Sequence, residues 1–174
     1  MLKIMDFLDL AKARYSLRKY TGQPVEAEKV QKVLEAALCA PTAHNLQPQR
    51  IYVLSGPVQM EKINRCTSCH FGEPCVLMVG YDDTVSWKRE FDGKDYGEVD
   101  ATIAATQMML EAQQLGLGTC GIGFYDPQKL AEEFPLPENI HIIGLITLGY
   151  PTEDAHPAKL HTASIPMEQM VTYL

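Results

Sequence analysis

The sequence predicts a single domain of the α+β class, in which helices and strands share one core. The chain has 174 residues, 46% of them hydrophobic and 21% charged, which is ordinary for one globular domain. Residues 75–81 and 140–149 are continuous apolar runs, as expected of strands covered on both faces. Helical periodicity marks residues 26–40 and 98–115. We therefore treat residues 1–174 as one domain.

Shorter patterns predict the remaining elements. A helical stripe over residues 4–13 consists of Ile4, Phe7, Leu8 and Leu10. Residues 50–55 are predicted as a strand, 57–65 and 127–134 as short helices, and the Gly-rich stretch 119–125 as extended chain. The helix over 98–115 is apolar around most of its circumference, so we expect it to be buried on more than one side. The tail after Pro151 has little periodicity and is expected to run extended over a surface, its own or a partner's.

Composition excludes several classes of partner. The formal net charge of −7 argues against nucleic acid or an anionic membrane as the main partner. Five cysteines are an odd count and do not indicate a disulfide framework. Asp6 interrupts the apolar run that a signal peptide would need, and no stretch is long enough to span a membrane. These observations predict a cytoplasmic protein.

The segment Arg14-Tyr15-Ser16-Leu17-Arg18-Lys19-Tyr20 is the first candidate site. If it is extended, Arg14, Ser16 and Arg18 share one face and present two guanidinium groups with a hydroxyl between them. Arginine binds phosphate oxygens bidentately and keeps its charge at physiological pH, so this face suits a permanently anionic ligand. The alternative is a solvated basic surface without a ligand.

Glycines supply a second candidate. Residues 116–121 match G-x-G-x-x-G, but they follow a helix and lead into extended chain, which is the reverse of the dinucleotide-binding order. We therefore reject a Rossmann site. Gly121-Ile122-Gly123 still lets backbone approach a flat ligand closely. A helix stop followed by a bulged strand explains the same glycines.

Other motifs leave alternatives open. Cys66-Thr67-Ser68-Cys69-His70 matches a haem-attachment pattern, and a metal site, a thiol redox pair and incidental loop cysteines are its possible explanations. Trp87, Phe91 and Tyr96 either roof a pocket or pack their own loop. Asp100 opens a helix, where the helix dipole is sufficient explanation for a carboxylate. No set of residues for nucleophilic catalysis can be assembled.

Taken together, these motifs resemble the nitroreductase family of FMN-dependent oxidoreductases. The resemblance rests on Arg14-Tyr15-Ser16-Leu17-Arg18, the loop 40–48, the helix opening at Val99-Asp100 and the stretch 115–123, in that family's order and spacing. It covers nearly the whole chain, which is similar to a short member without the helical insertions that roof the pocket of longer ones. The resemblance implies a central, mostly antiparallel sheet flanked by helices, in an intertwined homodimer whose core would include the helix over 99–115.

The resemblance also implies a site. The phosphate, ribityl chain and pyrimidine edge of FMN would be held by Arg14, Tyr15, Ser16 and Arg18. The backbone of Gly121, Ile122 and Gly123 would run past the flavin ring. Pro41, Thr42, Ala43 and Asn45 would come from the other subunit. Lys159 occupies the place of a basic phosphate ligand, and His161 stands where a second one, usually Arg, is expected. Gln49 stands where an aromatic residue is common. No metal and no catalytic side chain is implied, because the flavin carries the chemistry and Arg18 acts as an electrostatic stabiliser.

The resulting hypothesis is an NAD(P)H-dependent flavin oxidoreductase. Hydride would pass through FMN to an electron-poor acceptor, such as a nitroaromatic or a quinone, by a ping-pong mechanism. One alternative is a flavin-binding or flavin-delivery protein without efficient turnover. Another is a thiol-based redox module built on Cys66 and Cys69.

Overall fold

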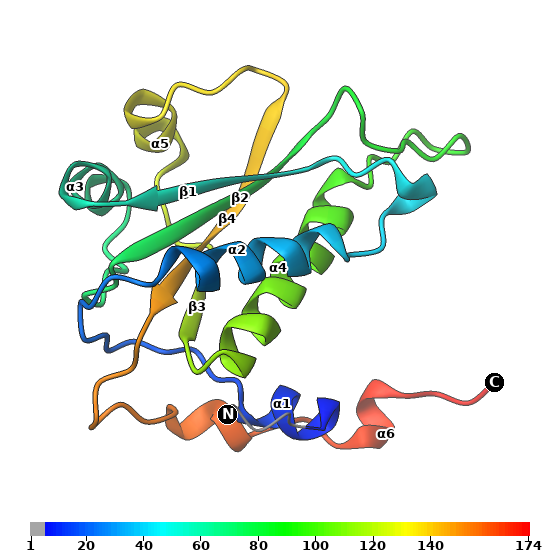
Figure 1. The fold of residues 1–174 in the computed structure, drawn as a ribbon. Helices are drawn as coiled ribbons and strands as arrows, with labels where there is room; N and C mark the ends of the chain where they lie inside the picture. The colour runs from blue at the N-terminus through cyan, green and yellow to red at the C-terminus, as the bar shows by residue number, and fades with distance from the viewer. Residues whose placement is uncertain (1–5) are drawn as a thin grey trace.

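A four-stranded antiparallel sheet forms the centre of the molecule (Figure 1), in a computed structural model that describes residues 6–174. Its strands are β1 (Gln49–Ser55), β2 (Cys75–Asp82), β3 (Gly118–Ile122) and β4 (Ile140–Gly149). They lie in the order β1-β2-β4-β3, and each neighbouring pair is antiparallel. The predicted α+β class with a mostly antiparallel sheet is confirmed, and β1 and β3 are its two edges.

Helices cover both faces of the sheet. On one face lie α2 (Ala27–Leu38) and α4 (Gly97–Gln114), and on the other α3 (Pro57–Cys66) and α5 (Pro127–Glu133). Successive residues of β2 enter opposite cores: Leu77 packs with the α2 and α4 side, whereas Val76 and Met78 pack with the α3 and α5 side. This arrangement explains why the strand is apolar without interruption.

Helix α4 is covered on more than one side, and its most deeply buried positions form one stripe. The buried apolar positions repeat at helical spacing and are small or flexible: Ala101, Ala104, Met108 and Ala112. Ile103 and Met109 are only half-buried, and Thr102 is exposed. Because α1 (Phe7–Ala13), α2 and the sheet all contact the helix, the expectation of burial on more than one side agrees with the structure, and the exposed residues are confined to Glu98, Val99, Thr102 and Thr106.

The first described helix and the C-terminal tail lie together. The tail lies beside helix α1 and contains the short helices η2 (Lys159–Thr162) and α6 (Met167–Met170) (Figure 1). A ring nitrogen of His161 lies 3.1 Å from the Lys12 carbonyl oxygen. The tail thus contacts the chain's own surface at His161, whereas Leu160, Ile165, Met167 and Met170 are exposed. It also contains two short helical turns that its sequence did not predict. Ile4, the first member of the predicted stripe, lies outside the described residues.

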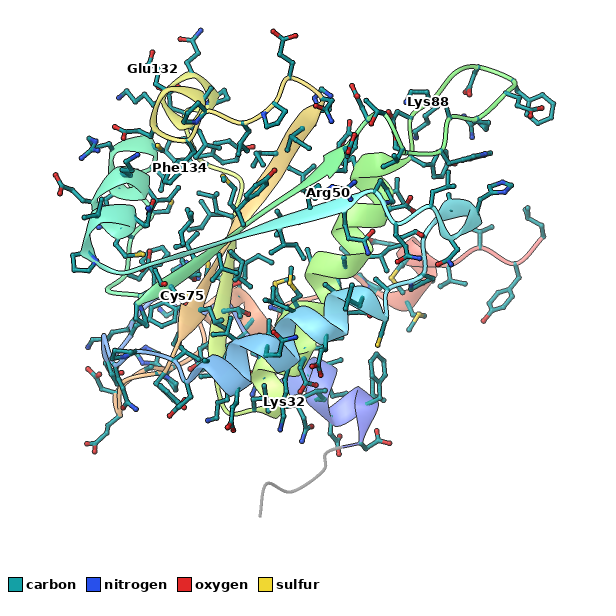
Figure 2. All side chains as sticks on the ribbon, turned by 45° about the horizontal axis from the view of Figure 1, so that its top comes forward. Lys32, Arg50, Cys75, Lys88, Glu132 and Phe134 are labelled. Carbon is teal, nitrogen blue, oxygen red and sulfur yellow. The ribbon has the colours of Figure 1, made fainter. Side chains whose placement is uncertain are left out.

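The polar segment between β2 and α4 forms a narrow projecting loop. Lys88 and Asp95 form an isolated bridge across it, and Arg89 pairs with Asp92 near its tip. In Figure 2, Lys88 lies on this loop, beyond the body of the sheet. The Trp87 ring packs edge-on against Tyr96 at 5.0 Å, whereas Phe91 is 97% exposed. Two of the three aromatic residues therefore pack at the base of their own loop.

Within residues 6–174, no helix combines the length and the hydropathy needed to cross a bilayer. The cytoplasmic location stays a prediction from the sequence.

Candidate ligand-binding site

The basic segment lies along the outer edge of β3. Ser16 forms a parallel bridge with Thr119, and the Leu17 N–H donates to the Thr119 carbonyl oxygen at 2.9 Å. Leu17 is 1% exposed, whereas Arg18 is exposed and Arg14 and Ser16 are partly exposed. This is the alternation predicted for extended chain: Leu17 anchors the segment in the core, and its polar neighbours stay accessible.

Two contacts fix this segment to the sheet. A Cβ atom at Gly118 would lie 2.2 Å from the Leu17 Cδ2 atom, so Leu17 packs where only glycine leaves room. The Tyr20 hydroxyl lies 2.5 Å from the Thr147 Oγ1 atom of β4, and burial raises the Tyr20 pKa, which keeps the phenol neutral. The segment is therefore held at both ends of its run along β3.

Ion pairing distinguishes the arginines of this segment from the others. Arg50, Arg65 and Arg89 pair with Asp82, Glu133 and Asp92, respectively. Among the described residues, Arg14 and Lys159 have no hydrogen bond or ion pair from their side chains, and Arg18 contacts only the Ser16 carbonyl oxygen, at 3.5 Å. In a chain of net charge −7, two neighbouring arginines without a carboxylate indicate a place for an external anion.

Exposed backbone without side chains lies at the end of β3, at Gly121 and Gly123. A Cβ atom at Gly121 or at Gly123 would meet nothing within 4 Å, and both residues are exposed. Between them, the Ile122 side chain is 6% exposed and packs into the core beside α3 and α5. The glycines therefore do not serve internal packing. They leave an open backbone surface two residues beyond Thr119, against which a flat ligand can lie.

The tail reaches the basic segment through His161. The rings of His161 and Tyr15 are 6.1 Å apart and nearly perpendicular, and the His161 ring also contacts the Lys12 carbonyl oxygen. Lys159 is exposed in the same short helix, η2. The structure thus brings η2 beside Tyr15.

The loop with Pro41, Thr42, Ala43 and Asn45 lies elsewhere in the chain. It forms the short helix η1 (Ala43–Asn45), and the Ala43 N–H donates to the Asp100 Oδ1 atom at the start of α4 at 3.0 Å. Figure 1 shows η1 and this end of α4 far from the chain between α1 and α2, which carries Arg14–Tyr20. One chain alone does not bring the two sets of predicted residues together.

The loop between α3 and β2 also borders the site, which the sequence did not indicate. The Thr67 hydroxyl donates to the Phe124 carbonyl oxygen at 2.5 Å, and the Tyr20 N–H donates to the Phe71 carbonyl oxygen at 3.2 Å. This loop therefore connects the basic segment to the end of the glycine stretch. Because both acceptors are backbone carbonyls, no residue-type pattern could have predicted the contacts.

The cysteines of that loop do not form an evident reactive centre. Cys66 is 3% exposed, its thiol contacts the Lys62 carbonyl oxygen at 3.4 Å, and burial raises its pKa, which disfavours the thiolate. Cys69 is half-buried. Among residues 6–174, no group of three or more His, Cys, Asp or Glu side chains is placed to hold a metal ion.

Comparison with known proteins identifies the family. The sequence profile of the Nitroreductase family matches residues 11–71 and 68–150. The chain belongs to the nitroreductase family. A nitroreductase family protein from Clostridium difficile 630 has a solved structure with 35% identity and a TM-score of 0.91, covering 97% of this chain and 98% of that one.

Curated relatives of this nitroreductase family member carry names of reductases and dehydrogenases. The NADH dehydrogenase of Thermus thermophilus is 26% identical over 204 residues, covering 99% of this chain and 98% of the relative. The FMN reductase (NAD(P)H) of Bacillus subtilis is 27% identical over 159 residues, covering 79% of this chain and 63% of the relative. The family predicted from the sequence is thus confirmed.

Proposed function

We propose that residues 1–174 form one FMN-binding domain that acts as an NAD(P)H-dependent oxidoreductase. The observation that carries this proposal is the pairing of two arginines that lack carboxylate partners, Arg14 and Arg18, with the open backbone at Gly121 and Gly123. Family membership and a relative named as an FMN reductase support it.

The residues present fit FMN. Its phosphate is dianionic and matches the Arg14 guanidinium group together with Lys159 in the adjoining tail. Its ring is flat and matches a strand surface on which added Cβ atoms would occupy otherwise open space. A ligand that is anionic at one end and planar at the other satisfies both halves of the site.

The protein's own groups have binding and electrostatic roles. Arg14 and Lys159 would hold the phosphate, and Ser16 and Tyr15 the chain that leads to the ring. Arg18 would place a fixed positive charge at the pyrimidine edge, which favours two-electron reduction. When bound, FMN supplies hydride transfer from NAD(P)H to an electron-poor acceptor of the nitroaromatic or quinone type, in a ping-pong sequence.

The proposed enzyme is a homodimer in which the loop with Pro41, Thr42, Ala43 and Asn45 completes the other subunit's site. Its distance from Arg14–Tyr20 within one chain supports this arrangement. Half-buried apolar residues on α4, Ile103 and Met109 among them, and exposed Phe7 and Leu38 nearby supply apolar surface for a subunit interface.

The visible spectrum of the purified protein, followed by anaerobic titration with NADH and with NADPH, tests the proposal. We expect a yellow protein whose flavin absorbance is bleached by at least one nicotinamide within the time of turnover. A protein that stays colourless after incubation with FMN contradicts it. A yellow protein that neither nicotinamide bleaches is a flavin carrier rather than an oxidoreductase.

A further inference from the structure

The loop from Pro41 to Gln47 has an unusual backbone. His44, Asn45 and Gln47 have φ angles of 52°, 55° and 51°, in the left-handed region that residues with side chains rarely adopt. Such a backbone persists only where surrounding contacts determine it. The Thr42 carbonyl and hydroxyl oxygens accept from the N–H groups of Asn45 and Gln47, at 3.0 and 3.1 Å. These bonds close the turn but do not attach it to the rest of the protein.

Three contacts attach the loop, and one of them is at its end, where the Arg50 Nη1 atom of β1 donates to the Gln47 carbonyl oxygen at 3.1 Å. The Ala43 N–H donates to the Asp100 Oδ1 atom at 3.0 Å, and the His44 ring stacks on Trp87 with ring centres 5.4 Å apart. The hydrogen bond to Asp100 comes from α4, which is packed in the core, whereas Trp87 belongs to the base of a projecting loop. Asp100 of α4 therefore ties the start of the turn, at Ala43, to a rigid element, while Arg50 of β1 holds its end at Gln47.

The burial of Asp100 exceeds what a helix start requires. Asp100 is 2% exposed, and its Oδ2 atom is buried without a hydrogen-bond partner among the described residues. Burying a carboxylate with so few partners is unfavourable. Glu98 lies in the same first turn, is exposed, and supplies the same charge to the helix dipole without that cost. The position of Asp100 thus needs a second reason, and the Ala43 N–H provides it.

We propose that Asp100 is a positioning residue that fixes the Pro41–Gln47 loop in its strained conformation by accepting the Ala43 N–H. Its effect on flavin binding rests on the proposed function, in which this loop enters the other subunit's site. A loop already held in its binding conformation loses less conformational entropy when the ligand binds. Asp100 therefore raises FMN affinity without contacting FMN.

The test compares three variants of the full-length protein. Asp100→Ala removes the acceptor, Asp100→Asn keeps a carbonyl oxygen at its position, and Glu98→Ala removes a carboxylate from the same helical turn without a contact to the loop. Hydrogen exchange of peptides covering residues 41–47 and the dissociation constant of FMN are measured for each variant, well below its melting temperature.

We expect Asp100→Ala to speed exchange in residues 41–47 and to weaken FMN binding, each about 10-fold. Asp100→Asn should stay within about threefold of wild type and Glu98→Ala within about twofold. If Asp100→Ala does not fold, Asp100→Leu replaces it. Unchanged exchange in the acceptor-free variant, or an equal effect of Glu98→Ala, overturns the positioning role.

The two readouts separate this inference from the proposed function. Exchange in residues 41–47 is measured without added FMN, so it decides whether Asp100 holds the loop even if the wild-type protein binds no flavin. Faster exchange with unchanged FMN affinity means that the loop does not contribute to the flavin site, and it overturns the link between Asp100 and the cofactor. A wild-type protein that does not bind FMN contradicts the proposed function alone.

Discussion

At the scale of single residues, the site differs from the remaining surface in how its charges are compensated. Arg14 and Arg18 lie on one accessible side of extended chain, and no carboxylate among the described residues pairs with either. By contrast, Arg65 contacts both Glu133 and Glu61. An unpaired cluster in an acidic protein is understandable if an anionic ligand completes it.

Replacing Arg14 tests this explanation. Arg14→Ala should weaken FMN binding by about 1.5–3 kcal/mol, roughly 10- to 100-fold, because hydrogen bonds to a charged group are lost. Arg65→Ala is the control, since it removes the same charge from α3, where a carboxylate already pairs with it. Fluorescence titration of FMN measures both variants. Equal affinity of Arg14→Ala and wild type would remove Arg14 from the site.

At the scale of elements, the glycines of β3 have opposite structural roles. Gly118 faces Leu17 so closely that a methyl group would overlap it, whereas Gly121 and Gly123 face open space. Neither Gly118 nor Gly121 has a positive φ, so an alanine at either position differs mainly in what its methyl group contacts. The sequence shows four glycines between 116 and 123 without distinguishing these roles, because the distinction depends on a segment about a hundred residues earlier in the chain.

A pair of alanine substitutions separates packing from binding. Gly121→Ala should leave the melting temperature nearly unchanged and weaken FMN binding at least about 10-fold, because the methyl group occupies the surface where the ring would lie. Gly118→Ala should instead destabilise the fold by about 1–3 kcal/mol through overpacking against Leu17. Thermal unfolding and FMN titration measure both. If Gly121→Ala binds FMN as wild type does, the glycine stretch does not contact the ring.

The end of β2 contains a carboxylate whose pKa predicts an acid dependence of stability. Asp82 accepts from the Thr84 hydroxyl at 2.5 Å and the Asn139 amide at 2.8 Å, and it pairs with Arg50 at 3.0 Å. The hydrogen bonds from Thr84, then that from Asn139, lower the Asp82 pKa from 3.8 to about 2. Because the folded-state pKa is depressed, the ionised form contributes stability above pH 4, and this contribution is lost as pH falls from 4 to 2.

Urea unfolding at a series of pH values tests this linkage. Asp82→Asn should be less stable than wild type at pH 7, and the difference should shrink as pH falls through the range from about 4 to 2. Glu90→Gln serves as the control, because Glu90 is exposed and has no ion pair among the described residues. A difference between Asp82→Asn and wild type that does not change with pH would mean that the charge of Asp82 does not stabilise the fold.

At the scale of the whole molecule, the sequence predicts the helices and strands well but predicts the contacts between them poorly. Periodicity located β2, α4 and β4 within two residues, since each has a strong local pattern. It did not indicate that Asp100 holds Ala43, because a carboxylate at a helix start has a sufficient local explanation. The left-handed backbone at residues 44, 45 and 47, which costs about 1–3 kcal/mol for each residue, was not predicted either, although His and Asn adopt it more often than most residue types. The Asp100–Ala43 contact was missed because it joins a side chain to a backbone group far away in the sequence, and a backbone group carries no residue-type pattern.

Subunit mixing tests the proposed division of the site between two chains. Arg14→Ala and Asn45→Glu should each bind FMN poorly, the first through a lost cation and the second through a carboxylate near an anionic ligand. If Arg14 of one chain works with Asn45 of the other, a dimer of the two variants has one doubly altered site and one native site. Mixed dimers isolated from the two homodimers therefore have about one half of the wild-type number of FMN sites.

A site formed within one chain predicts a different number of restored FMN sites. If both residues served a site within one chain, every site in the mixed dimer would carry one substitution, and mixing two inactive variants would restore nothing. Co-expression of differently tagged chains, purification through both tags and FMN titration provide the measurement, with each variant dimer alone as the control. Because both variants are present in equal amount in either case, restored binding can arise only from a site that draws residues from two chains. Absence of any restored site, in a preparation shown to contain mixed dimers, would contradict the intertwined arrangement.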